Sequence, residues 1–253
     1  MNRKLTPGQV APFGPISSER PADTIVEKIR ERLVSSELKV GDKLPSEREL
    51  EQQFQVSRNS IRQALKALTN MGLLEIRKGA KGGAFVTSGG GETLGNTFSD
   101  LFHLGAIDAR HLTEVRVIIG TEIARLASER ATSEEIEQIE ANIVAAEAAV
   151  RAGNTALRTT LNLDFHRLLA TMSHNPLLDK LSAAVLTVTG QLATEMPPMP
   201  DRSVMALRRR LLAHLKSRDA DAAAAEMRKH LLRVAPHYLK YIKKTDQPSK
   251  RKR

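Results

Sequence analysis

The 253-residue sequence contains no cysteine and no tryptophan. Without thiols it can form no disulfide, no cysteine-ligated zinc site and no cysteine nucleophile. No apolar run approaches the roughly 20 residues that cross a bilayer, and residues 1–20 lack the apolar centre of a signal peptide. We therefore expect a cytoplasmic protein with no membrane partner.

Aromatic residues are also scarce, at 3% of the chain, whereas 41% of its residues are hydrophobic. The length leaves room for two domains, each with an aliphatic core. Lysine and arginine outnumber the acidic residues by 39 to 29, and the resulting net charge of +10 favours a polyanionic partner. The sequence has no phosphate loop, no activated nucleophile and no convincing carboxylate pair, so we do not expect an enzyme.

Proline, glycine and charge patterns divide the chain into five segments. Residues 1–20 are rich in proline and glycine, which predicts a flexible arm, and three consecutive glycines mark a linker at 88–92. A domain at 21–87 precedes the linker, and helical periodicity dominates 93–243 after it. The basic segment 244–253 is expected to be a disordered tail that either adds salt-sensitive DNA attraction or has no role.

The segment 44–86 has the element order of a winged helix-turn-helix. Ser46 with Glu49 three residues later forms the pattern of a capping box, which predicts the start of a short helix. After a turn, Ser57 can cap a second helix. That helix has apolar residues at the spacing of one buried face: Ile61, Leu65 and Leu68.

A polar and basic stripe runs along the opposite face of this second helix. At about 100° per residue, Asn59, Arg62 and Lys66 lie together, and Arg58 occupies the exposed first turn. Arginine can bind a guanine edge and asparagine an adenine edge through paired hydrogen bonds, which suits a major groove. Hydroxyls and amides at the helix N-terminus suit phosphates instead, and this role is predicted for Ser57 and Ser60.

Two strand-like runs follow, at 73–77 and 84–86, separated by a basic glycine-rich tip. We interpret the tip as a wing that lies along the DNA backbone or minor groove. The alternative, that the charged helix face is merely solvated, is disfavoured because Glu75 is the only acid among many basic residues from 55 to 81.

The run "LKVGDKLPSERELEQQFQVSRNSIRQALKALTNMGLLEIRKGAKGGAFV", together with the residues from Ile25 before it, resembles the N-terminal domain of the GntR family of bacterial transcription regulators. The resemblance implies a homodimeric repressor whose domains each bind half of a short pseudo-palindromic DNA operator. It also places Arg48 and the wing residues at the DNA, while Asn59 and Ser60 replace threonines common in the family. The residues expected to contact DNA are Arg48, Ser57, Arg58, Asn59, Ser60, Arg62, Lys66, Lys78, Gly79 and Lys81.

The second domain is predicted to be a bundle of six or seven helices, which makes the fold mostly α. Thr132 with Glu135 forms another capping box, Asn175 precedes a proline restart, and Asp219 can cap the last long helix. Breaks are expected near Gly153 and at the prolines between 197 and 200.

Two arginines fall on apolar helix faces of this domain. Arg116 shares a face with Ile119 and Ile123, and Arg208 lies within the arc of neighbouring leucines. Burying an unpaired guanidinium costs several kcal/mol, so each arginine has to meet a carboxylate from the protein or from a ligand. Two internal salt bridges are therefore one alternative, and an anion site is the other.

The block from 112 to 230 resembles the FadR-type, all-helical effector (FCD) domain of the same family. Many members bind a divalent metal, and the resemblance places Asn162, His166 and His230 at three of the ligand positions. Arg208 falls at the remaining imidazole position, where a permanent cation has no lone pair and repels a dication. His214 is a weaker substitute for that imidazole. We expect no cofactor and no tightly bound zinc.

In place of a metal we predict a site for a small carboxylate effector, such as a sugar acid or another organic acid. Its residues are Arg116, Asn162, His166, Arg208 and His230. Two alternatives remain open. The helical domain serves only for dimerisation in a constitutive DNA-binding factor, or a metal held by the asparagine and the two histidines mediates effector binding.

Overall fold

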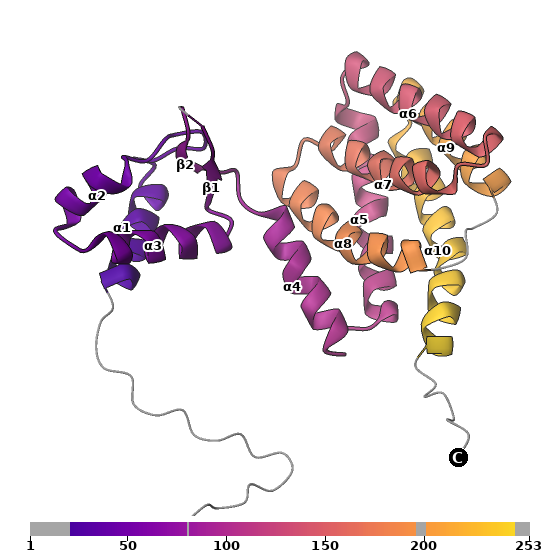
Figure 1. Cartoon of the computed structure of the whole chain (residues 1–253). Coiled ribbons are helices and arrows are strands. Elements are labelled where there is room, and N and C mark those ends of the chain that lie inside the picture. Colours follow the sequence, from indigo (N-terminus) through magenta and orange to yellow (C-terminus); the bar gives the residue numbers. More distant parts are fainter. Residues whose placement is uncertain (1–20, 80, 196–200, 246–253) are drawn as a thin grey trace, which may run out of the picture. The chain divides into compact units, whose positions relative to one another are not determined.

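The computed structural model describes residues 21–79, 81–195 and 201–245, and the chain divides between Gly89 and Gly90 into two compact units (Figure 1). The proposed arm at 1–20, the prolines between 197 and 200 and most of the basic tail lie outside these residues. The mostly α fold predicted from the sequence is confirmed, with a small winged helix-turn-helix followed by a helical bundle.

The first unit contains three helices and one hairpin. The helices are α1 (Pro21–Val34), α2 (Glu47–Phe54) and α3 (Arg58–Asn70), and the strands are β1 (Leu74–Arg77) and β2 (Gly83–Val86). The strands pair antiparallel, with Leu74 opposite Val86 and Arg77 opposite Gly83, which forms the expected wing. The sequence patterns did not single out α1, although its apolar residues pack into the same core as α3.

Local caps explain where α2 and α3 begin. Ser46 Oγ accepts a hydrogen bond from the Glu49 amide at 3.3 Å, and Glu49 Oε2 accepts one from the Ser46 amide at 2.7 Å. Ser57 Oγ accepts from the Ser60 amide at 3.3 Å. Both caps were predicted, and they satisfy amides that would otherwise lack partners at a helix start.

The second unit contains seven helices in its described residues. They are α4 (Gly91–His103), α5 (Ala109–Arg130), α6 (Ser133–Arg151), α7 (Thr155–Met172), α8 (Pro176–Glu195), α9 (Asp201–Ser217) and α10 (Ala220–Thr245). The start of α4 corrects the expected linker at 88–92, because its last two residues are already helical. An acidic side chain, Glu92, in the first turn of α4 favours this early start.

The caps predicted at Thr132 and Asp219 are present, and Asn175, which was predicted to precede a restart of the chain, also caps a helix. Thr132 and Glu135 form the capping box of α6, Asn175 Oδ1 accepts from two amides at the start of α8, and Asp219 Oδ1 accepts from the Ala222 amide of α10. Each cap stands between two helices, so the caps fix where the chain reverses.

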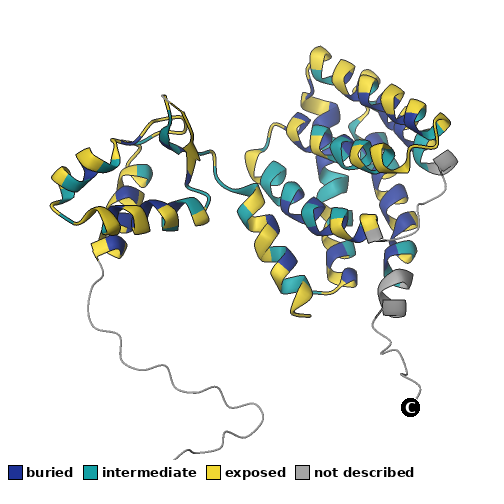
Figure 2. Cartoon of the chain, in the orientation of Figure 1, coloured by how far each residue is buried: buried dark blue, intermediate teal, exposed yellow. Residues whose placement is uncertain are grey.

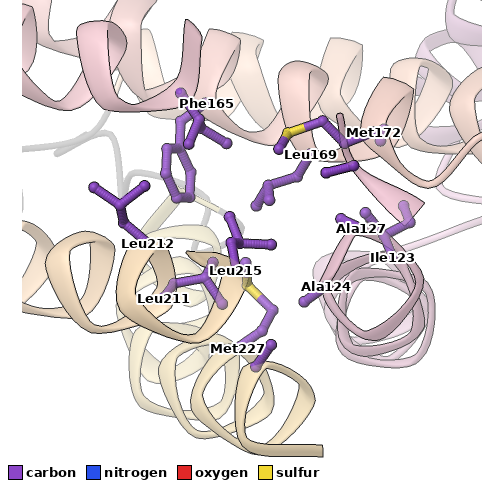
Figure 3. Close-up of a cluster of buried hydrophobic side chains, with 14 of the residues drawn as sticks. Ile123, Ala124, Ala127, Phe165, Leu169, Met172, Leu211, Leu212, Leu215 and Met227 are labelled. Atoms are coloured by element: carbon purple, nitrogen blue, oxygen red, sulfur yellow. The ribbon is translucent and has the colours of Figure 1, made fainter. Parts of the chain in front are cut away.

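The bundle core lies where α5, α6, α7, α9 and α10 converge, and Figure 2 shows the buried residues on their inner faces. Phe165 and Leu169 of α7, Leu211 of α9 and Met227 of α10 point toward one another in Figure 3. Helix α5 packs along α10, and α4 packs against α8. Across the residues that the structure describes, none of the helices combines the length and the apolar character of a membrane span.

Candidate functional site

The exposed face of α3 carries the stripe predicted to contact DNA. Arg58, Asn59, Arg62 and Lys66 are all exposed, whereas Ile61 on the opposite face is fully buried. The hydroxyl of Ser57 is tied to the helix start, and Ser60 is half-buried beside it. The long polar side chains of α3 are therefore exposed on one face, while the capping serines lie at the helix end.

An acidic residue from the preceding helix pairs with two of these arginines. Glu47 Oε2 accepts from Arg58 Nε at 3.1 Å, and Glu47 Oε1 accepts from Arg62 Nε at 3.3 Å. Such half-exposed ion pairs contribute about 0–1 kcal/mol, so a phosphate or a base can replace them. Charge counted along residues 55 to 81 missed Glu47, because the contact forms between helices rather than along the chain.

The remaining predicted DNA contacts are exposed too. Arg48 lies on α2, and Lys78, Gly79 and Lys81 lie in the turn between β1 and β2. Gly79 has φ +104, a left-handed conformation that favours glycine. At the base of the hairpin the Arg77 guanidinium stacks over the Phe85 ring at 4.2 Å, which holds one cation against the wing.

Arg208 on α9 is the most unusual polar residue of the bundle, because it is only 1% exposed. Its Nη2 donates to Asn162 Oδ1 on α7 at 2.7 Å, and its guanidinium lies 4.6 Å from the centroid of the Phe165 ring. Its Nη1 is buried and has no hydrogen-bond partner among the described residues. Burial lowers the pKa of Arg208 to about 10, so the group still carries its charge at neutral pH.

Two histidines lie close to this guanidinium. Burial, followed by the charges of Arg116, His230 and Arg208, holds the pKa of His166 well below its ordinary value. Burial, and then Arg233, Arg116 and Arg208, lowers the pKa of His230 to about 3, although Glu226 opposes the shift. Both imidazoles are therefore neutral at pH 7, and each offers one hydrogen-bond donor and one acceptor.

A cavity of about 30 Å³ opens between α5, α7, α8 and α10. Its polar wall residues are Arg116, His166 and Ser182, and the rest of the wall is apolar apart from Gly120. The Arg116 guanidinium stacks over the Tyr238 ring at 4.9 Å. Stacking engages the face of a guanidinium and leaves its N–H edge available for an anion.

The structure thus brings the five predicted effector residues into one region. Arg116 and His166 line the cavity, and Arg208 and His230 lie close enough to His166 to lower its pKa. Asn162 is engaged by Arg208. Sequence reasoning missed Ser182 and the two aromatic rings under the arginines, because the helices that carry them are distant in the chain.

The alternative of internal salt bridges for these two arginines finds no support among the described residues. Neither Arg116 nor Arg208 forms an ion pair with an acid there, whereas Arg209 pairs with Glu147 and Arg210 with Glu226, each at 2.6 Å. The acids that pair with this part of α9, Glu147 and Glu226, therefore contact its exposed arginines and not Arg208.

The donor set does not match a divalent metal. No group of three His, Cys, Asp or Glu residues able to hold a metal occurs within the described parts of the chain. The Asn162 oxygen is occupied by a guanidinium, which leaves two imidazoles beside a fixed cation. His214 does not line the cavity; its backbone carbonyl accepts from Ser128 on α5. Zinc ordinarily takes three or four protein ligands.

Each of the two units matches a known protein family. Residues 21–86 match the family described as bacterial regulatory proteins, gntR family, and residues 111–233 match the FCD domain. The chain is 30% identical over 232 residues to the HTH-type transcriptional repressor NanR of Escherichia coli (strain K12), which covers 87% of this chain and 85% of that protein.

The repressor of the same name from Citrobacter rodentium (strain ICC168) is 28% identical over 231 residues, covering 87% of this chain and 86% of its own. Among solved structures, Streptococcus agalactiae GntR is similar with a TM-score of 0.64 at 24% identity, covering 85% of this chain and 99% of that one. The last likeness is one of fold.

Proposed function

The chain belongs to the GntR family of bacterial transcription regulators and carries an FCD domain after its DNA-binding domain. We propose that it is a repressor and that a small carboxylate changes its affinity for the DNA operator. It acts in the cytoplasm as a homodimer, and it has no catalytic role. Each DNA-binding domain contacts one half of a pseudo-palindromic operator.

In this proposal α3 enters the major groove. Arg58, Asn59 and Arg62 read base edges, and Lys66 and the helix start contact phosphates. Arg48 and the wing residues Lys78, Gly79 and Lys81 hold the domain on the backbone. The exposure of the whole stripe supports this assignment.

The main support for the proposed effector site is the buried guanidinium of Arg208. It is 1% exposed, it has no acidic partner in the described residues and its Nη1 has no hydrogen-bond acceptor. An isolated buried charge is expensive, and a carboxylate ligand would provide both the counter-charge and the acceptor. The neutral His166 and His230 add hydrogen bonds that do not repel an anion.

Helix α8 gives this site a route to the DNA-binding domain. It supplies Ser182, Val185 and Leu186 to the cavity wall, and it also contacts α4, the helix that follows the linker. We infer that a ligand shifts α8 and α4 together and so changes the freedom of the DNA-binding domains. The ligand has to favour one arrangement over the other, since equal affinity for both shifts nothing.

The test is operator binding, measured by fluorescence anisotropy on a duplex selected by the protein from random DNA, in the presence of a panel of carboxylic acids. At least one acid is expected to change the operator Kd tenfold or more. Arg208→Met keeps the volume and removes the charge, and it should abolish that response while sparing DNA binding. Arg209→Met, the exposed neighbour, serves as the control and should respond as the natural protein does.

An unchanged operator Kd with every acid, or a full response in Arg208→Met, would contradict the proposal. Because Met can fold into an apolar site, a retained melting temperature in Arg208→Met shows that any loss of response is not a loss of fold.

A further inference from the structure

We propose that the effector is a short aliphatic dicarboxylate, with one carboxylate bound by Arg116 and the other by Arg208 and His166. This assignment rests on the proposed function, because it names the ligand class for the same cavity. It excludes both simple monocarboxylates and polyhydroxylated sugar acids as the preferred ligand.

The first argument is the number of unpaired charges. Arg116 projects into the cavity from α5 and Arg208 lies beside it on α9, so two guanidinium groups act on the same two histidines. No aspartate or glutamate is among the residues that line the cavity. A monoanion would neutralise one guanidinium and leave the other without a counter-charge, whereas a dianion matches both.

The second argument is the way in which the two guanidiniums are held. Each stacks on an aromatic ring, Arg116 on Tyr238 at 4.9 Å and Arg208 on Phe165 at 4.6 Å. The rings restrain the two guanidiniums on different helices, and the hydrogen bond to Asn162 restrains Arg208 further. Two rigid anchors from α5 and α9 favour a ligand with two acidic groups at a defined separation.

The third argument concerns the wall. Apart from Arg116 and His166, the one side chain with a hydroxyl in the cavity wall is that of Ser182, and no amide lines it. The other side chains are apolar: Ile119, Ile123, Leu169, Val185, Leu186, Met227 and Leu231. The hydroxyls of a sugar acid would lose their water against such a wall without gaining partners, whereas methylene groups are favoured there. The middle of the ligand is therefore hydrocarbon.

The small size of the cavity favours a small ligand. At about 30 Å³ it is much smaller than an ordinary ligand site. Arg208 is not among the residues that line it, so a ligand that reaches Arg208 has to displace wall side chains, and a short chain needs the least displacement. A long fatty acid would need most of the core around it to move.

The experiment compares matched acids with the full-length protein, by calorimetric titration and by thermal shift. Glutarate is the aliphatic diacid, butyrate is the monoacid, and glucarate is a diacid with hydroxyls along its chain. Glutarate is expected to bind at least tenfold more tightly than either, because it alone satisfies both anchors and the apolar wall.

Variants locate the second carboxylate. Arg116→Gln should reduce the affinity for glutarate about tenfold or more and leave that for butyrate within about threefold, so the diacid loses its advantage. Arg110→Gln removes the same charge from the exposed first turn of α5 and should leave both affinities unchanged. Arg208→Lys keeps the charge and loses the planar pair of donors, and it should weaken both acids.

The results separate the dicarboxylate assignment from the more general proposal of a carboxylate effector. Equal binding of glutarate and butyrate, or an undiminished glutarate affinity in Arg116→Gln, overturns the dicarboxylate assignment and leaves the carboxylate effector intact. Preference for glucarate overturns the hydrocarbon middle. If none of the three acids and no acid of the wider panel binds or shifts the melting temperature, the effector site itself is overturned.

Discussion

At the scale of single residues, the exposed arginines of α3 that we propose to contact DNA do not project as free cations. Glu47 lies between Arg58 and Arg62 and accepts a hydrogen bond from the Nε of each. Their terminal nitrogens stay available for bases, because the carboxylate engages Nε. Glu47 therefore orients the two guanidiniums and lowers the local positive charge at the same time.

We expect Arg62→Ala to weaken operator binding by roughly 1–3 kcal/mol and to change binding to random DNA little, since a base contact is lost. Lys78→Ala in the wing should weaken both to the same extent, because phosphates are common to all sequences. Anisotropy titrations on operator and scrambled duplexes at one salt concentration measure both. Equal losses for Arg62→Ala would assign that residue to a phosphate.

Glu47→Gln is expected to raise affinity for random DNA by up to about fivefold, the scale of the ion pairs that it removes. The affinity should also fall more steeply with salt, because two arginines then act on phosphates as full charges. Glu27→Gln makes the same charge change on α1, where the acid pairs with Arg30 instead, and should have little effect. Unchanged salt dependence in Glu47→Gln would show that Glu47 does not restrain these arginines.

The candidate effector residues show what a sequence can and cannot reveal at this scale. Helical spacing predicts that Arg116 and Arg208 face inward, and family resemblance adds Asn162, His166 and His230. Spacing along one helix says nothing about what the opposite helix presents. The Glu47 bridge, Ser182 in the wall and the rings of Phe165 and Tyr238 are contacts between helices, so they emerge only from the fold.

At the scale of elements, the contact of α4 with α8 is unusually close. A Cβ added at Gly95 of α4 would lie 2.6 Å from Thr187 Oγ1 and 3.0 Å from its Cβ on α8. Glycine therefore allows two helices to approach at the point that joins the cavity wall to the helix after the linker. The sequence alone marks Gly95 only as a weak helix former, since the neighbour that requires it is far away in the chain.

Gly95→Ala is expected to lower the free energy of unfolding by about 1–2 kcal/mol. The added methyl overpacks the contact, and the better helix propensity of alanine offsets only part of that cost. In a Thr187→Ala background the loss should shrink, since the nearest atom is gone. Urea denaturation of the four proteins gives both values, and an equal loss in the two backgrounds would show that the contact with Thr187 does not set the cost.

The helix starts were predictable because their caps are local. Ser46, Ser57, Thr132 and Asp219 each accept from the amide three residues away, so a short window of sequence contains the whole interaction. Helix α1 lacks such a signal, and the residues before it carry no periodicity. Its apolar face becomes evident only once the core of the first unit is assembled.

At the scale of the whole molecule, two histidines of the bundle, the buried His230 and the half-buried His166, link the stability of the second unit to pH. The folded state holds His230 neutral with a pKa of about 3, against 6.5 for the ordinary group. Between these values the unfolded chain binds more protons, so stability is complete above about pH 6.5 and is lost as the pH falls toward 3. His166 acts in the same direction.

We expect the free energy of unfolding to fall by about 2 kcal/mol from pH 7 to pH 5 through His230 alone, at about 1.4 kcal/mol for each pH unit below 6.5. Urea curves at the two pH values measure the difference, and His230→Gln should reduce it. His214→Gln, on α9 outside the cavity wall, should keep the full difference. The carboxylates with lowered pKa, such as Glu226, titrate below this window. An undiminished pH dependence in His230→Gln would contradict the assignment.

The carboxylate between two DNA-facing arginines has a consequence for how such a regulator is distributed in a cell. A genome offers roughly 10⁶–10⁹ competing sites for every operator, and they bind through charge alone. If α3 contacts DNA as proposed, its partial neutralisation by Glu47 shortens each chance encounter with unrelated DNA. A larger share of the molecules is then free at any moment, and fewer copies of the protein suffice to keep one operator occupied.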